Sequence, residues 1–259
     1  MKKLLVLISL LFAFNVMASS ITKEQCINKG DDFIYVVSEC IEYRYFEGED
    51  NEALNIIVHG TWDEGTNTLG RYEPFAETVN LETDISTIAI ALPGYSNSSS
   101  NEFLSLGNKK AKNLAAKKEY VLFVSKVLSA LKEEYNAKTL NYIGHSAGAM
   151  IGATITGLKP ELINNIVLAG GRYDIHQVTN EKNLISIVDV LNNVNKDINF
   201  LFIYGQKDKI SKPEVTISFE NKMKKLGFNT TLVEVKNAPH IDLDMSDKSL
   251  ESISELLSN

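Results

Sequence analysis

The chain has 259 residues, of which 44% are hydrophobic and 23% are charged, and its formal net charge is −7. This length and composition suit one globular core, and no long run of like charge or low complexity interrupts the chain, which excludes a largely disordered protein. The acidity argues against nucleic acid or an anionic membrane surface as a partner.

The first 18 residues have the pattern of a secretory signal peptide. Lys2 and Lys3 precede an apolar stretch from Leu4 to Phe14, and small side chains lead to an expected cleavage point near Ala18. The apolar stretch is far shorter than the roughly 20 residues that span a bilayer. We therefore expect a protein that is secreted or periplasmic after cleavage, with no stable membrane anchor.

The N-terminal segment that remains after cleavage, residues 19–48, contains both cysteines of the chain, Cys26 and Cys40. In an oxidising compartment this pair predicts one disulfide, which would stabilise the fold by roughly 3 kcal/mol. No histidine lies near the pair in the sequence, so no metal site is expected. Residues 32–45 alternate well enough to predict two short antiparallel strands that open a sheet.

Two further strands are predicted next. Residues 54–58 form an apolar run that ends in His59-Gly60-Thr61-Trp62, and more glycines follow that turn. Residues 88–92 form the second run, and Pro93-Gly94 behind it indicates a turn in which the glycine can adopt a positive φ. Both runs read as strands that are buried on both faces of a parallel sheet.

A helix is predicted over residues 109–135, beyond a stretch that is rich in serine and asparagine. Apolar side chains recur on one face of it at helical spacing, at Val121, Val124, Leu128, Leu131 and Tyr135. We interpret this stripe as core packing and the charged residues between its members as a solvated face.

A serine is placed where the next strand must reverse sharply into a helix. The apolar run 140–143 leads into Gly144-His145-Ser146-Ala147-Gly148, and residues 149–153 continue as a helix. The two glycines remove side chains that would collide with the strand and the helix, so the serine hydroxyl is lifted clear of the sheet. This pattern indicates a nucleophile elbow. A serine that merely caps the helix would show the same five-residue pattern, so the other candidate site residues must decide between a nucleophile and a helix cap.

Three apolar runs after the elbow each end in a residue that could act with the serine. Asp174, Asp208 and His240 follow these runs, which are residues 166–173, 198–204 and 230–235. Ligands of open parallel sheets bind beyond the carboxyl ends of the strands, so these loops can converge on Ser146. Asp208 is our candidate for an acid that orients His240, and Asp174 is its rival. A lid has room only at residues 172–197, where a short amphipathic helix is predicted over residues 183–194.

In order and spacing, the motifs resemble those of the α/β-hydrolase superfamily from about residue 50 to the C-terminus. The resemblance rests on His59-Gly60, Pro93-Gly94-Tyr95-Ser96, Gly144-His145-Ser146-Ala147-Gly148, Gly205-x-x-Asp208 and His240. It implies an α/β fold with a mostly parallel central sheet, helices on both faces and a small or absent cap, in a catalytic domain over residues 49–259. The chain departs from the pattern where many esterases have a run of glycines, since it reads His-Gly-Thr-Trp, and at Pro239, where glycine is frequent.

Carried over residue by residue, the resemblance makes Ser146 the nucleophile, His240 the base and Asp208 the acid. The backbone N–H groups of Thr61 and Ala147 would form the oxyanion hole, with Trp62 as the alternative to Thr61. These roles predict a serine hydrolase that cleaves carboxylic esters of small molecules through an acyl-enzyme intermediate, with no cofactor and no metal. Trp62, Tyr95, Phe103 and Tyr173 are candidates for lining an apolar acyl pocket, and each could equally be ordinary packing.

Two other functions remain open at this point. A small serine peptidase or aminopeptidase of the same fold would share the triad, but it would need a recognition site for a peptide amine or carboxylate. A hydrolase-like binding protein would keep the fold without turnover. Covalent labelling by a fluorophosphonate separates the enzymes from the binder, because that probe reacts with an activated serine.

Overall fold

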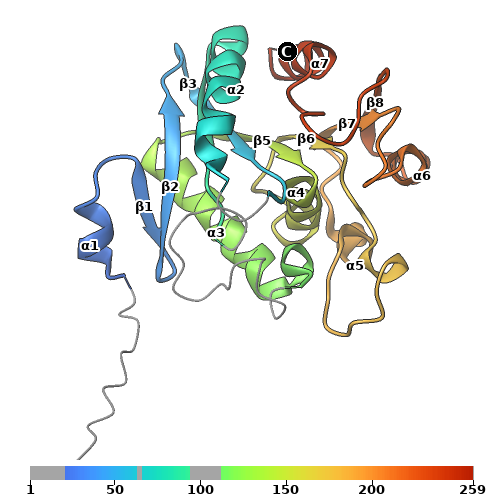
Figure 1. The fold of residues 1–259 in the computed structure, drawn as a ribbon, viewed down its shortest axis with the longest axis horizontal. Helices are drawn as coiled ribbons and strands as arrows, with labels where there is room; N and C mark the ends of the chain where they lie inside the picture. The colour runs from blue at the N-terminus through green and yellow to red at the C-terminus, as the bar shows by residue number, and fades with distance from the viewer. Residues whose placement is uncertain (1–20, 63–65, 94–111, 259) are drawn as a thin grey trace, which may run out of the picture.

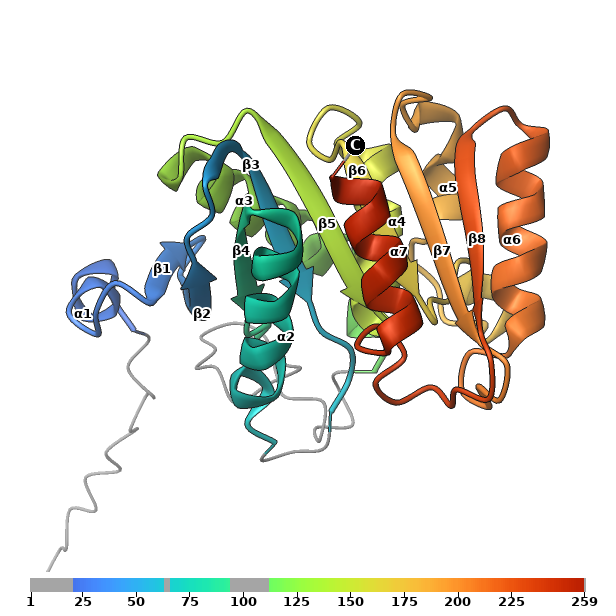
Figure 2. The ribbon, with the colours of Figure 1, turned by 90° about the horizontal axis from the view of Figure 1, so that it is seen from above.

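A computed structural model describes residues 21–62, 66–93 and 112–258 (Figure 1). Several sequence-based predictions lie outside these ranges, namely the signal peptide at residues 1–18, the motif residues 94–96, Phe103 and the first residues of the helix predicted from residue 109. The described residues form one twisted sheet with helices packed against it, as Figures 1 and 2 show.

The sheet has the strand order β1-β2-β4-β3-β5-β6-β7-β8 in the described part of the chain. The strands are β1 (Phe33–Val36), β2 (Glu39–Phe46), β3 (Asp50–Val58), β4 (Ile85–Ile90), β5 (Thr139–His145), β6 (Asn165–Ala169), β7 (Asn199–Gly205) and β8 (Asn229–Val235). The pairs β1–β2 and β2–β4 are antiparallel, and all other neighbours are parallel. This arrangement confirms the predicted fold class and the two short antiparallel strands that open the sheet.

Helices cover both faces of the sheet (Figure 2). On one face lie α2 (Thr68–Thr83) and α7 (Asp247–Leu257), and on the other lie α3 (Lys118–Glu134), α4 (Ala147–Leu158) and α6 (Pro213–Lys225). Shorter helical turns complete the described chain: α1 (Lys23–Ile27), α5 (Ile187–Val190), and the 3₁₀ turns η2 (Leu114–Ala116), η3 (Ile175–Gln177) and η4 (Leu191–Asn193).

The alternation of side chains along each strand divides the core into two layers. On β3, Ile56 and Val58 pack into the layer beneath α3 and α4, while Ile57 packs into the layer beneath α2 and α7. All three are buried, which explains why this part of a central strand reads as consecutive apolar residues in the sequence.

The helix predicted over residues 109–135 begins later than expected. In the described part of that range, α3 begins at Lys118 and is preceded by the separate turn η2. The chain cannot be helical just before α3, because Asn113 is left-handed with φ 55° and Lys117 is extended and forms a β-bridge with Leu184. The stripe itself is confirmed as core, since Val121, Val124, Leu128 and Leu131 are fully buried.

The helix predicted over residues 183–194 is also wrong in its extent. The structure has one α-helical turn, α5, followed by η4. Asn183 is left-handed with φ 65°, and the side chains of Ser186 and Asp189 form a capping box that starts the helix only at Ile187. Val190 then leaves helical geometry at φ −124°. The connection between β6 and β7 therefore contains one α-helical turn between two 3₁₀ turns in place of the predicted helix.

The N-terminal segment joins the same sheet and carries a disulfide. Cys26 on α1 is bonded to Cys40 on β2, both side chains are buried, and their Cα atoms lie 5.6 Å apart. Ile41 and Tyr43 on β2 add to the core layer beneath α3. None of the helices in the described ranges combines the length and the apolar character needed to cross a bilayer.

Candidate active site

Ser146 lies at the junction between β5 and α4 with a strained backbone, at φ 54° and ψ −111°. This region is sparsely populated by residues with a side chain, and its cost must be offset by the packing around the turn. A Cβ atom on Gly148 would lie 2.1 Å from the carbonyl oxygen of Val58, and one on Gly144 would lie 2.8 Å from the nitrogen of Ala149. Both glycines are therefore needed for the turn to close against β3 and α4.

The structure brings Ser146, His240 and Asp208 together. The His240 Nε2 atom lies 2.8 Å from the Ser146 hydroxyl oxygen, and the His240 Nδ1 atom lies 2.7 Å from a carboxylate oxygen of Asp208. A carboxylate can only accept, so Nδ1–H donates to Asp208 and Nε2 is left to accept from the serine hydroxyl. The three side chains lie beyond the carboxyl ends of β5, β7 and β8, at one edge of the sheet.

The Asp208 carboxylate is held rigidly by the loop that carries it. Its second oxygen accepts hydrogen bonds of 2.8 Å from the backbone N–H groups of Ile210 and Ser211. The side chain is completely buried, whereas that of His240 is 16% exposed. Three donors around one buried carboxylate fix its orientation and compensate for its desolvation.

The rival acid, Asp174, is not brought to His240. Its carboxylate accepts from the backbone N–H of His176 at 3.1 Å and from the side-chain amide of Gln177 at 2.9 Å. These bonds cap the turn η3, on the connection that follows β6. The Asp174 carboxylate therefore stabilises the turn that it begins.

Thr61 and Ala147 line the same cavity as Ser146 and His240, and that cavity has a volume of about 410 Å³. Ala147 is the first residue of α4, where backbone N–H groups are free of helix partners and the helix dipole is positive. Trp62 does not line the cavity, and its ring lies under the Arg71 guanidinium at 4.2 Å. This placement favours Thr61 over Trp62 as the second donor residue.

His59 holds the loop that carries Thr61. Its Nδ1–H donates to the carbonyl of Gly60 at 2.7 Å, and its Nε2 accepts from the backbone N–H of Leu92 at 3.0 Å. Burial lowers the pKa of His59 to about 4, so the ring is neutral at pH 7. In a trans peptide the N–H points opposite to the carbonyl, so anchoring the Gly60 carbonyl also orients the N–H of Thr61.

A second histidine, His145, contacts His240, and a second buried carboxylate, Asp244, lies next to His145. The Nε2–H of His145 donates to the backbone carbonyl of His240 at 2.9 Å, and its Nδ1 lies 3.8 Å from an oxygen of the buried Asp244. Burial, followed by the negative charge of Asp244, raises the pKa of the nearby Tyr72 hydroxyl well above its ordinary value. Sequence reasoning missed this support for His240, because His145 and Asp244 are neighbours only after folding.

The remaining described lining of the cavity is largely apolar. It consists of Asn113, Ala115, Ala116, Met150, Gly170, Arg172, Ile175, Ile210 and Ser211. Two aromatic residues considered for this lining are packed elsewhere: Tyr173 is buried against Phe219, with ring centroids 4.5 Å apart, and Trp62 packs on Arg71. Within the described ranges, no three histidine, cysteine or acidic side chains are grouped so that they could hold a metal ion.

Comparison with known proteins agrees with the fold. Residues 56–194 match the profile of the family described as the alpha/beta hydrolase fold. The esterase Pf2001 of Pyrococcus furiosus is similar in structure, with a TM-score of 0.65 and 16% identity over 87% of this chain and 90% of that one. Esterase PE8 follows with a TM-score of 0.62 and 15% identity over 84% and 97%. For Est1E of Butyrivibrio proteoclasticus the TM-score is 0.56, with 13% identity over 87% and 95%.

At these identities the likeness to solved structures shows the fold alone. No curated protein is significantly similar to the chain in sequence.

Proposed function

Because the chain belongs to the alpha/beta hydrolase fold family, we propose that it is an exported serine hydrolase that cleaves carboxylic esters of small molecules. The observation that carries this proposal is the continuous hydrogen-bond chain from the Ser146 hydroxyl through His240 to Asp208, at 2.8 Å and 2.7 Å. A buried carboxylate, an imidazole and a hydroxyl in this order are the groups that activate a serine for attack on a carbonyl.

In the acylation step, His240 Nε2 takes the proton of the Ser146 hydroxyl while the serine oxygen attacks the ester carbonyl carbon. Asp208 holds the imidazole in the required tautomer and stabilises the imidazolium that forms. The N–H groups of Thr61 and Ala147 donate hydrogen bonds to the carbonyl oxygen and stabilise the negative charge that develops on it. The imidazolium then gives its proton to the departing alcohol, which leaves an acyl group on Ser146.

Deacylation repeats these steps with water as the nucleophile. His240 takes a proton from the water molecule, the hydroxide oxygen attacks the acyl carbon, and the proton returns to the Ser146 oxygen as the acid departs. The side chain of His240 is 16% exposed at the cavity, so water can reach it after the alcohol has left.

Two observations support the remaining parts of the proposal. The Cys26–Cys40 disulfide suits an oxidising compartment, which agrees with export after cleavage of the N-terminal segment near Ala18. The solved structures of similar fold include proteins named as esterases, and a cavity of about 410 Å³ has room for a small ester.

The test is a hydrolysis panel of p-nitrophenyl esters from acetate to palmitate, run beside aminoacyl p-nitroanilides. We expect turnover of the short esters, no turnover of the anilides, and a loss of several orders of magnitude in kcat for Ser146→Ala with an unchanged circular dichroism spectrum. Faster hydrolysis of anilides than of esters would instead assign a peptidase. Equal turnover by Ser146→Ala and the unaltered protein would refute the serine mechanism.

A further inference from the structure

Arg172 carries the one permanent charge among the described side chains that line the catalytic cavity. It follows Gly170 and Gly171 directly after β6, on the same side of the sheet as Ser146. Around it the cavity wall is formed by apolar or neutral side chains, including Ile175 and Ile210. The Arg172 side chain is partly exposed at this wall, so its guanidinium can meet a ligand that enters from solvent.

The guanidinium of Arg172 has few hydrogen-bond or ion-pair partners among the described residues. In the described part of the chain its hydrogen bond runs from Nη2 to the carbonyl of Ile210 at 3.3 Å, which is longer than the usual range. No carboxylate of the described residues forms an ion pair with it. A guanidinium has five N–H donors in a planar fork, so most of its hydrogen-bonding capacity is left for a ligand.

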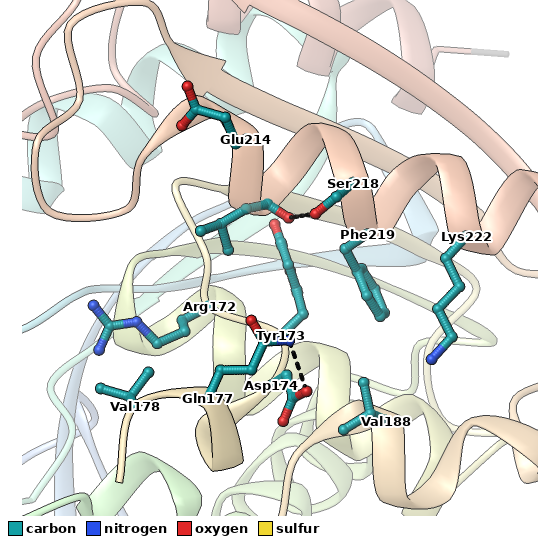
Figure 3. A pocket seen from close by; sticks show the side chains of 11 residues that line it. Arg172, Tyr173, Asp174, Gln177, Val178, Val188, Glu214, Ser218, Phe219 and Lys222 are labelled. Carbon is teal, nitrogen blue, oxygen red and sulfur yellow. Dashed lines mark hydrogen bonds between the residues drawn. The ribbon is translucent and has the colours of Figure 1, made fainter.

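A second cavity, of about 340 Å³, shares Arg172 and lies between the connection after β6 and helix α6. In Figure 3 the Arg172 side chain extends toward Val178, and the carboxylates of Asp174 and Glu214 point in other directions. The second cavity is also lined by Lys222, so its two cations are already matched by these two carboxylates. The catalytic cavity has no carboxylate among its described lining residues, so an anion is favoured there.

We infer that the substrate of this enzyme carries a carboxylate, and that Arg172 binds it in a bidentate fork while Ser146 attacks the ester. The inference rests on the proposed ester hydrolysis and deepens it. A guanidinium matches a carboxylate in geometry as well as in charge. The carboxylate can reside on the acyl side or on the leaving-group side of the ester.

Matched ester pairs separate these two positions. Monomethyl glutarate and methyl valerate differ by a carboxylate on the acyl side, and 4-acetoxybenzoate and 4-acetoxybenzamide differ by one on the leaving group. For at least one pair we expect kcat/KM to favour the anion by about tenfold, which corresponds to one charge-assisted contact. Arg172→Gln should abolish this preference, and Arg172→Lys should keep only part of it.

Lys209→Gln is the matched control, because it removes one positive charge from an exposed side chain on the loop that carries Ile210. We expect that variant to keep the preference for the anion. Neutral esters hydrolysed without any preference for the anion, or a preference that survives in Arg172→Gln, would overturn the inference and leave the proposed hydrolysis intact.

A binding measurement does not depend on turnover. Titration of glutarate and of 4-hydroxybenzoate into the Ser146→Ala protein by calorimetry should give a Kd that rises about tenfold or more when Arg172→Gln is added. An unchanged Kd for both anions would contradict the role of Arg172. If none of the four esters is hydrolysed, the proposed function fails, and this titration still decides whether Arg172 binds a carboxylate.

Discussion

The carboxylate of Asp208 is the most tightly held side chain of the site. Two backbone N–H groups fix one of its oxygens and the imidazole of His240 occupies the other. Such a carboxylate cannot rotate away from the histidine, so it can hold one tautomer of the ring through the whole reaction. Asp174 has comparable bonds, but they all belong to its own turn.

These contrasting environments predict different effects for two identical substitutions. Asp208→Asn is expected to lower kcat by roughly a thousandfold or more, because an amide next to Nδ1 favours the tautomer that cannot accept the serine proton. Asp174→Asn should leave kcat within about twofold, since its side chain only caps η3. Steady-state kinetics on one p-nitrophenyl ester compares the two variants. Equal losses in both, or a larger loss in Asp174→Asn, would contradict the assignment of the acid.

His59 makes the stability of the protein depend on pH. Burial lowers its pKa from 6.5 in the unfolded chain to about 4 in the folded protein. Between these values the unfolded state binds a proton that the native state does not, so the free energy of unfolding falls as the pH falls from about 6.5 to about 4. The full contribution is about 3 kcal/mol at most.

Replacing His59 should make the free energy of unfolding depend less on pH below about 6.5. For His59→Gln, urea unfolding between pH 4.5 and 7.5 is expected to show a shallower decrease in unfolding free energy toward acid pH than the unaltered protein shows. His176→Gln is the control, because a hydrogen bond with Asp189 raises the pKa of His176 and gives its contribution the opposite sign. A profile for His59→Gln that is as steep as that of the unaltered protein would exclude this account of His59.

The contact between α4 and β3 decides the position of the elbow. Gly148 lets the first turn of α4 approach the backbone of β3 so closely that a methyl group would lie 2.1 Å from the Val58 carbonyl oxygen. The helix can meet the strand at this distance only because no side chain intervenes. Ser146 is strained at the same junction, so any shift of α4 also moves the hydroxyl relative to His240.

Gly148→Ala should therefore reduce stability and activity together. We expect a loss of roughly 2 kcal/mol or more in the free energy of unfolding, since α4 must move away from β3, and a lower kcat in the protein that still folds. Gly70→Ala on α2 is the comparison, because its new methyl group would meet the side chain of Asn67, which caps α2, and the expected loss is that of one helix cap, about 1 kcal/mol. Urea denaturation and ester hydrolysis measure both effects. An unaltered stability for Gly148→Ala would show that the contact is not tight.

Local sequence signals predicted most of the strands and the elbow. Buried parallel strands read as apolar runs whatever their neighbours are, and a strand-to-helix turn needs glycines close to Ser146. The same signals failed for the helical segments around residues 109–135 and 183–194. There the β-bridge between Lys117 and Leu184 and the left-handed residues Asn113 and Asn183 override helical periodicity.

The candidate site could be predicted in part, because its residues follow apolar runs that can be recognised as strands. The chain order of Ser146, Asp208 and His240 could be read from the strands that precede them. The choice between Asp208 and Asp174 depends on how loops beyond different strands turn toward His240, which spacing does not specify. The support of His240 by His145 and Asp244, and the position of Arg172 in the cavity, arise from contacts between distant parts of the chain.

Across the whole molecule, the disulfide and the candidate site lie far apart. α1 and β1 stand at one end of the sheet, whereas β7 and β8, which precede Asp208 and His240, lie at the other end (Figures 1 and 2). The Cys26–Cys40 bond ties α1 to β2, and neither cysteine is among the described residues that line the cavity. Its contribution should therefore be to stability alone.

Replacing both cysteines separates stability from activity. The double variant Cys26→Ser, Cys40→Ser is expected to lose about 3 kcal/mol of unfolding free energy, because its unfolded chain is no longer cross-linked, with kcat unchanged where the protein is folded. Treatment of the unaltered protein with dithiothreitol should produce the same shift in urea midpoint. A loss of kcat at temperatures well below unfolding would mean that the N-terminal segment supports the site.

The central claim is that Ser146 is an activated nucleophile, and an intact-mass measurement after incubation with a fluorophosphonate tests it most directly. We predict one adduct on the unaltered protein, mapped by peptide mass spectrometry to Ser146, with no adduct on Ser146→Ala and strongly slowed labelling of His240→Ala. An unaltered protein that stays unlabelled, or equal labelling of Ser146→Ala, would contradict the account.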